Sequence, residues 1–125
     1  MRRSSSDGAP LPLTPVEFHV LLSLADGKRH GYAILQEVAV RTDDQLRLRT
    51  GTLYTVIKRM LDSGWIGEVD SPADEIDERR RYYAVTYEGR TILRTEAQRL
   101  ESLVRFAQEK RVLARPRRLA PERGR

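Results

Sequence analysis

The side chains best suited to chemistry lie on one face of a helix predicted over residues 52–62. Thr52, Thr55 and Arg59 recur at i, i+3 and i+7 with Lys58 beside them, so they share one side of a helix. Threonine can bond to phosphates or base edges, and arginine or lysine can reach guanine. This face therefore suits a nucleic acid, although an ordinary exposed polar surface has the same composition. The opposite, apolar face predicts a core contact through Leu53, Ile57, Met60 and Leu61.

The residues that precede this helix add positive charge to its first turn. Thr50 is expected to cap the helix, and with Gly51 it leaves backbone N–H groups free to bind a phosphate. Arg47 and Arg49 lie just before it, in a stretch over residues 46–49 whose alternation of apolar and basic residues predicts a short strand. The start of the helix is thus a candidate anion site.

Charge is unevenly distributed along the 125 residues, a length typical of one domain. The net charge is +5, but residues 110–125 alone carry +6. Residues 28–59 carry +4, whereas residues 68–78 hold six acids and no base. A basic central block indicates an anionic partner such as nucleic acid, or else a solvated basic surface, and charge alone does not choose between them.

Composition argues against several classes of protein. Cysteine is absent and the two histidines, His19 and His30, have no recognisable partner motif, so we expect no metal, no cofactor and no catalytic site. The chain has a mean hydropathy of -0.57. It shows no long apolar run and no secretory leader, so we expect no membrane association and a cytoplasmic location.

The predicted elements follow the order of a winged helix. A Ser-, Pro- and Arg-rich arm over residues 1–12 is expected to be disordered. A capping box of Thr14 and Glu17 then opens a first helix, and a second helix covers residues 32–40. After the third helix, strands over residues 65–69 and 79–85 form a hairpin. Thr86 caps a helix over residues 87–113, which is followed by a disordered basic tail over residues 114–125.

This order predicts a mainly α fold with a small β-hairpin wing. Residues 13–86 form a winged helix-turn-helix domain that binds DNA, and residues 87–113 form a long C-terminal dimerisation helix.

Apolar residues on the last helix repeat with the spacing of a coiled coil. Because a helix of that length exceeds what the small core can cover, we predict a homodimer; packing back on its own domain is the alternative. A two-fold dimer would place two recognition helices about 34 Å apart, which predicts a palindromic operator. The predicted interface residues are Leu93, Ala97, Leu100, Leu103, Val104 and Ala107.

Four short motifs in this order resemble the PadR family of winged-helix transcriptional regulators, in its short subfamily with one C-terminal helix. They are His-Gly-Tyr-Ala-Ile from residue 30, Gly-Thr-Leu-Tyr from residue 51, Gly-Trp-Ile from residue 64 and Arg-Arg-Tyr-Tyr-Ala-Val-Thr from residue 80. The resemblance covers residues 13–112. It implies a dimeric DNA-binding repressor, and many members are relieved by a small aromatic or cationic compound.

The resemblance also implies roles for single residues. Thr52 and Tyr54 would contact DNA, and Tyr32 would lie next to either the DNA backbone or the core. Thr55 replaces the proline usual in the family at this position, which leaves one more side chain for contacts. The predicted DNA-binding residues are therefore Tyr32, Arg49, Thr50, Gly51, Thr52, Tyr54, Thr55, Lys58, Arg59, Arg79, Arg80 and Arg81.

The tip of the wing is acidic, and the minor groove of DNA would repel its carboxylates. Any contact between the wing and DNA should therefore use the arginines at the base of the wing, which is why they belong to that set. A winged helix can also bind proteins, and a protein-interaction module without specific DNA binding is the alternative function.

Overall fold

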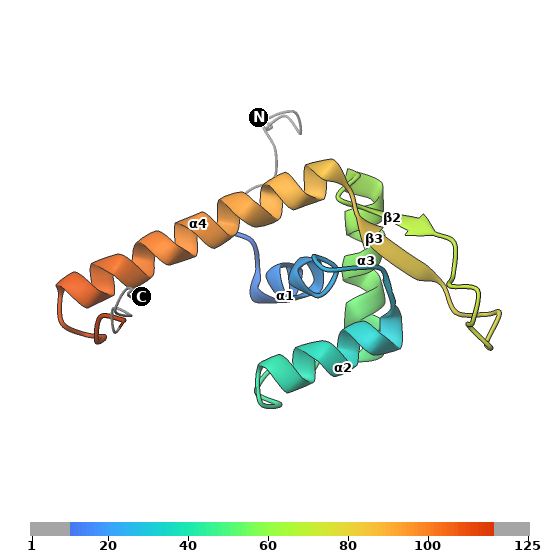
Figure 1. Ribbon diagram of the computed structural model, residues 1–125, viewed down its shortest axis with the longest axis horizontal. Helices are drawn as coiled ribbons and strands as arrows, with labels where there is room; N and C mark the ends of the chain where they lie inside the picture. The colour runs from blue at the N-terminus through green and yellow to red at the C-terminus, as the bar shows by residue number, and fades with distance from the viewer. Residues whose placement is uncertain (1–10, 117–125) are drawn as a thin grey trace, which may run out of the picture.

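The computed structural model describes residues 11–116, and residues 1–10 and 117–125 lie outside the described part. The elements follow one another as α1 (Pro15–Ser23), β1 (Arg29–His30), α2 (Gly31–Arg41), α3 (Thr50–Ser63), β2 (Ile66–Val69), β3 (Tyr82–Val85) and α4 (Tyr87–Glu109) (Figure 1). The predicted fold class, mainly helical with a small wing and a long last helix, is confirmed. Most of the predicted arm and basic tail falls outside the described residues, so their disorder stays a prediction.

The first three helices pack around one apolar core because each turns a stripe of aliphatic side chains inward. α1 begins at the predicted capping box: the Glu17 amide donates to the Thr14 hydroxyl over 3.1 Å, and the Thr14 amide donates to the Glu17 carboxylate over 2.8 Å. The core then fills with side chains from every helix, including Val20, Leu21, Leu24, Ile34, Val38, Leu53, Ile57, Met60, Ile92 and Leu93.

The sheet is three-stranded and antiparallel, in the order β1-β3-β2. β2 and β3 form the predicted hairpin with Ile66 opposite Val85 and Val69 opposite Tyr82, and the loop between them projects as the wing (Figure 1). The strand predicted over residues 46–49 is wrong: that segment is irregular, and its leucines are partly buried against the core. The edge of β3 is taken instead by Arg29 and His30, opposite Tyr83 and Tyr82.

Helix limits also differ from the prediction, by one residue at both ends of α2 and at the end of α3, and by more at the start of α3 and the end of α4. α3 begins at Thr50, so Arg49 occupies the cap position without a side-chain hydrogen bond and the predicted Thr50 cap is wrong. α4 ends at Glu109 rather than at residue 113, because Arg111 adopts a left-handed conformation with φ 64° that a continuing helix does not allow. The long helix therefore has 23 residues.

α4 is fixed to the wing by the turn at Thr86. The Thr86 hydroxyl accepts from the Gly89 amide over 3.0 Å, as the cap prediction required, and lies 2.6 Å from the Gly64 carbonyl. Gly89 sits so close to the chain after α3 that a Cβ atom there would lie 1.9 Å from the Trp65 carbonyl oxygen. Only glycine lets the two backbones approach this closely, and the contact sets the direction in which α4 leaves the core.

An ion pair between the buried Glu96 and the partly exposed Arg99 supports the middle of α4. Glu96 is 2% exposed, and its carboxylate accepts two hydrogen bonds of 2.8 Å from the Arg99 guanidinium. These bonds, together with the charge of Arg99 and a hydrogen bond from the Leu13 backbone, lower the pKa of Glu96 below its ordinary value, although burial acts in the opposite direction. Glu96 thereby ties the segment before α1 to α4.

This pair predicts an acid-sensitive contribution to stability. A carboxyl group with a lowered pKa in the folded state stabilises the fold above its unfolded pKa, near 4.5, and loses that contribution as the pH falls through the folded pKa. We expect Glu96→Gln to lower the free energy of unfolding at pH 7 and to flatten its decline between pH 5 and pH 2. Urea unfolding across that range measures both effects, and an unchanged pH profile would contradict the role of Glu96.

Candidate nucleic-acid interface

α3 presents one face to the core and leaves the other uncovered. Its buried residues are Leu53, Val56, Ile57 and Met60. Val56 was missing from the predicted core face, and Leu61, which was included in it, is only partly buried. The opposite face is exposed along its whole length and carries Gly51, Thr52, Thr55, Lys58 and Arg59.

The side chains on this exposed face differ in how freely they can bind a ligand. Lys58 is 78% exposed and makes only a loose ion pair of 3.4 Å with Asp62. Arg59 is held more firmly, because its guanidinium lies 3.0 Å from the Glu17 carboxylate, which is mostly buried. The Thr55 hydroxyl donates to the Gly51 carbonyl over 2.9 Å, within its own helix. Lys58 is therefore the most available cation on the helix.

The first turn of α3 carries further positive charge and an open backbone. Arg49 and Thr50 are exposed where the helix starts, and Arg47 is exposed two residues earlier. Within residues 11–116, neither Arg47 nor Arg49 forms an ion pair. A shallow hollow runs along this end of the helix, lined by Arg49, Gly51, Thr52, Thr55, Val56 and Arg59.

Tyr54 joins the start of α3 to the start of α2. Its hydroxyl lies so near Gly31 that a Cβ atom at that position would come within 2.3 Å of it. The glycine of the His-Gly-Tyr motif and the tyrosine of the Gly-Thr-Leu-Tyr motif are thus in contact in space. Tyr32 lies at the same place with its side chain 58% exposed, so it faces solvent and not the core.

A second hollow, of about 490 Å³, opens between these two tyrosines and the wing. Arg79, Arg80 and Arg81 line one side of it. Each of these arginines is paired with a carboxylate of the wing: Arg79 with Asp77 at 3.2 Å, Arg80 with Glu75 at 3.6 Å and Arg81 with Glu68 at 3.3 Å. The three arginines therefore lie together at the base of the wing, as predicted. In this structure each of them is engaged in an ion pair with a wing carboxylate, which a ligand would have to replace.

The wing acids respond to these neighbours. A hydrogen bond from the Tyr82 hydroxyl, with smaller contributions from the Asp77 amide and Arg80, lowers the pKa of Glu75. Hydrogen bonds from the Arg79 backbone and side chain lower the pKa of Asp77. Both carboxyl groups are thus ionised at neutral pH, so the wing keeps its negative charge.

The apolar stripe of α4 is divided between two environments. Leu93 is 7% exposed and belongs to the core of its own chain, so it leaves little surface for a partner. The buried residues of α4 end at Glu96, and the C-terminal half of the helix extends away from the other helices (Figure 1). There the side chains of Leu103 and Phe106 are 50% and 58% exposed. Val104 and Ala97 are also exposed, and Leu100 and Ala107 are partly buried.

Neither a membrane-crossing helix nor a cluster of metal-binding side chains is present in the part of the chain that the structure describes. Among residues 11–116, no helix is both long and apolar enough to cross a membrane. Within the same range, no three acidic, histidine or cysteine side chains converge as metal ligands would.

Comparisons with known proteins agree with this geometry. The model of the "Transcriptional regulator PadR-like family" matches residues 20–95. A solved PadR family transcription regulator from hypervirulent Clostridium difficile R20291 is 25% identical, with a TM-score of 0.64, over 77% of this chain and 97% of its own. A transcriptional regulator from Clostridium thermocellum shares the fold, with 24% identity and a TM-score of 0.63 over 75% and 87% of the two chains. An uncharacterised protein from Lysinibacillus sphaericus is 28% identical over 59% of this chain and 67% of its own.

An uncovered third helix, a hairpin wing and a projecting last helix define a winged-helix transcriptional regulator. The family match spans more than half of the chain, and the chain belongs to the PadR-like family of transcriptional regulators. The family places it among regulators of transcription.

Proposed function

We propose that this chain is a sequence-specific DNA-binding repressor that inserts α3 into the major groove. The observation that carries the proposal is the uncovered face of α3, where Thr52 and Lys58 are exposed. Just before the helix lie Arg47 and Arg49, which form no ion pair within residues 11–116. Side chains of these types can bond to base edges, and the arginines can contact phosphates on either side of the groove. Lys58 and Arg49 would supply most of the charge.

The same proposal makes the protein a homodimer at a palindromic operator. The uncovered end of α4 supports it, because exposed leucine, valine and phenylalanine side chains on a projecting helix gain stability when a second copy covers them. The contact would use Ala97, Leu100, Leu103, Val104 and Ala107. A small-molecule effector would relieve repression by favouring a dimer in which the spacing of the two α3 helices no longer matches the half-sites.

Salt dependence tests the proposal. DNA fragments selected from a random pool by the intact protein should bind with an affinity that falls steeply with salt, because each neutralised phosphate releases counterions. With about six phosphate contacts, the affinity should fall by roughly a thousandfold between 50 and 200 mM salt. Fluorescence anisotropy gives the slope. Selection of no DNA, with salt-insensitive binding to a protein, would support the interaction module instead.

A further inference from the structure

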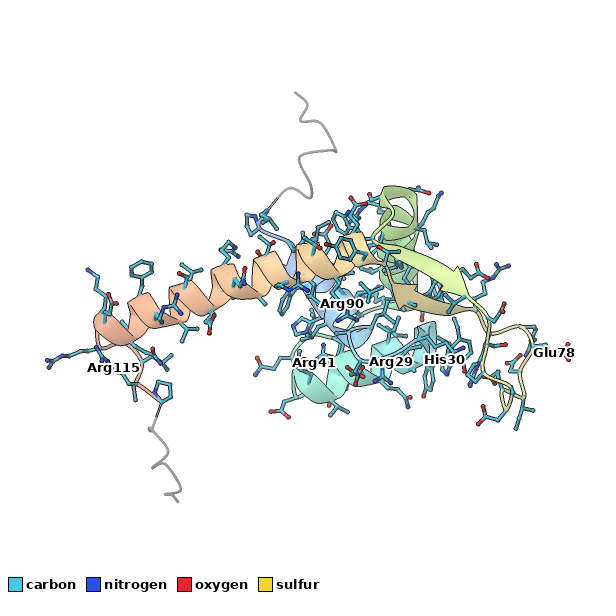
Figure 2. The ribbon with its side chains drawn as sticks, turned by 45° about the horizontal axis from the view of Figure 1, so that its top comes forward. Arg29, His30, Arg41, Glu78, Arg90 and Arg115 are labelled. Atoms are coloured by element: carbon cyan, nitrogen blue, oxygen red, sulfur yellow. The ribbon has the colours of Figure 1, made fainter. Side chains whose placement is uncertain are left out.

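The hollow between the wing and the tyrosines contains hydrogen-bond donors that residues 11–116 do not satisfy. His30 lies where the start of α2 meets the wing, and Glu78 lies further out on the wing loop (Figure 2). Its Nδ1 accepts from the Ala33 amide over 3.1 Å, so the proton of the neutral ring is on Nε2. Burial and, to a smaller extent, the nearby charge of Arg80 lower the pKa of His30, although the charge of Glu75 acts in the opposite direction. Because its pKa is lowered, the ring is neutral at pH 7.

This protonated Nε2 faces a second donor. It lies 3.3 Å from Nη1 of Arg80, and two N–H groups cannot hydrogen-bond to each other. An acceptor placed beside both would satisfy the two donors at once, and a negatively charged acceptor would bind most strongly to the guanidinium.

Tyr83 provides independent evidence for a ligand. The residue is only 3% exposed and lines the same hollow. Within residues 11–116 its hydroxyl has no hydrogen-bond partner, and a buried polar group without a partner is costly. Burial, followed by the nearby Tyr54 hydroxyl, raises the pKa of Tyr83, so it remains a donor at neutral pH. The Tyr54 hydroxyl is likewise without a partner in the described part of the chain.

Arg80 is the cation of the hollow that is most available to an anion. Each of the three lining arginines is paired with a wing carboxylate, and the pair of Arg80 with Glu75 is the longest at 3.6 Å. Asp77 and Arg79 satisfy each other, since the Asp77 Oδ1 accepts from both the Arg79 amide at 2.9 Å and the Arg79 side chain at 3.2 Å.

We propose that this hollow binds a phosphate group through His30, Tyr54, Arg80 and Tyr83, and that bound DNA presents this group from its backbone. The choice of DNA as the source rests on the proposed function, because Tyr54 belongs to the helix proposed to enter the groove. The site would fix the register of α3 by clamping one backbone position at its side. His30 and Tyr83 thereby join the DNA-binding residues.

A scan with neutral linkages tests the DNA source. Operator duplexes selected by the wild-type protein would carry one methylphosphonate, which lacks the phosphate charge, at each position in turn. We expect one position per half-site to weaken wild-type binding by roughly tenfold, as a charge-assisted hydrogen bond is lost. Tyr83→Phe should weaken binding to the unmodified duplex by a similar factor. A methylphosphonate at the sensitive position should not weaken the binding of this variant any further. Tyr87→Phe removes an exposed hydroxyl outside the hollow and serves as the control.

Inorganic phosphate tests the site without DNA. Titration of the intact protein with phosphate, against chloride at equal ionic strength, should shift the NMR signals of His30 and Tyr83 in the wild type and much less in Tyr83→Phe. Tyr54→Phe gives the same comparison should Tyr83→Phe fail to fold, because Tyr54 is partly exposed.

The two experiments separate the outcomes. One methylphosphonate position that weakens the wild type but not Tyr83→Phe supports a DNA phosphate as the ligand. Phosphate-induced NMR shifts without any such position support a site for free phosphate and overturn DNA as the source. Absence of both overturns the site. A protein that binds no DNA at all contradicts the proposed function, and the phosphate titration then still decides whether the site exists.

Discussion

Leu103→Asp on α4 is expected to convert the proposed dimer into monomers of 14.4 kDa. Leu103 lies on the stripe that continues from the buried Ile92 and Leu93, but beyond the point where α4 leaves its own core. A carboxylate there would have to be buried without a partner in the dimer, which is strongly unfavourable. Light scattering measures the mass. Operator affinity should fall by about 100-fold or more, because the second half-site is no longer tethered to the first.

Gln98→Asp is the matched control for this change. It adds the same charge to the same helix, at an exposed position on the opposite side from Leu103. This variant should keep the dimer mass and the operator affinity of the wild type. A dimer that survives Leu103→Asp would contradict the proposed interface on α4, and loss of secondary structure in that variant would show that Leu103 supports the fold.

The helical part of the fold was predictable because its determinants are local. The capping box of Thr14 and Glu17 and the cap at Thr86 involve residues three apart, and the structure has both. The apolar periodicity of α3 likewise identified most of its buried face. Such patterns depend on helix geometry alone.

Elements defined by distant contacts were not predictable in this way. β1 consists of Arg29 and His30, which have no strand pattern of their own and are extended only because they pair with β3. The apolar residues of α4 repeat evenly in sequence, yet the structure buries Leu93 in its own chain and exposes Leu103. The pattern shows that a face is apolar, and only the tertiary arrangement shows what covers it.

Only part of the proposed DNA-binding surface could be selected from the sequence. Lys58, Thr52 and the arginines of residues 79–81 could be selected by residue type and spacing. His30 and Tyr83 could not, because the role proposed for them depends on donors left unsatisfied within residues 11–116, and such donors are visible only when the neighbours of a side chain are known.

Replacing Thr52 and Lys58 by alanine in one variant is expected to reduce operator affinity by roughly a hundredfold, since each contact with a base or phosphate contributes about 1–3 kcal/mol. Neither side chain contributes to the core, so the unfolding transition should stay close to that of the wild type. The slope of log affinity against log salt should also decrease by about one, because one phosphate-neutralising charge is lost. Anisotropy titrations at several salt concentrations measure both quantities.

Lys110→Ala provides the control for the charge. Lys110 is an exposed lysine at the far end of α4, opposite the wing in Figure 2, where Arg115 marks that end. Its removal lowers the net charge by the same amount without touching α3, so any general electrostatic effect on DNA binding will appear in both variants. Equal losses in the two variants would mean that α3 contributes only charge and does not select the sequence. A loss confined to the α3 variant, larger for the operator than for unrelated DNA, is the result that sequence recognition by α3 requires.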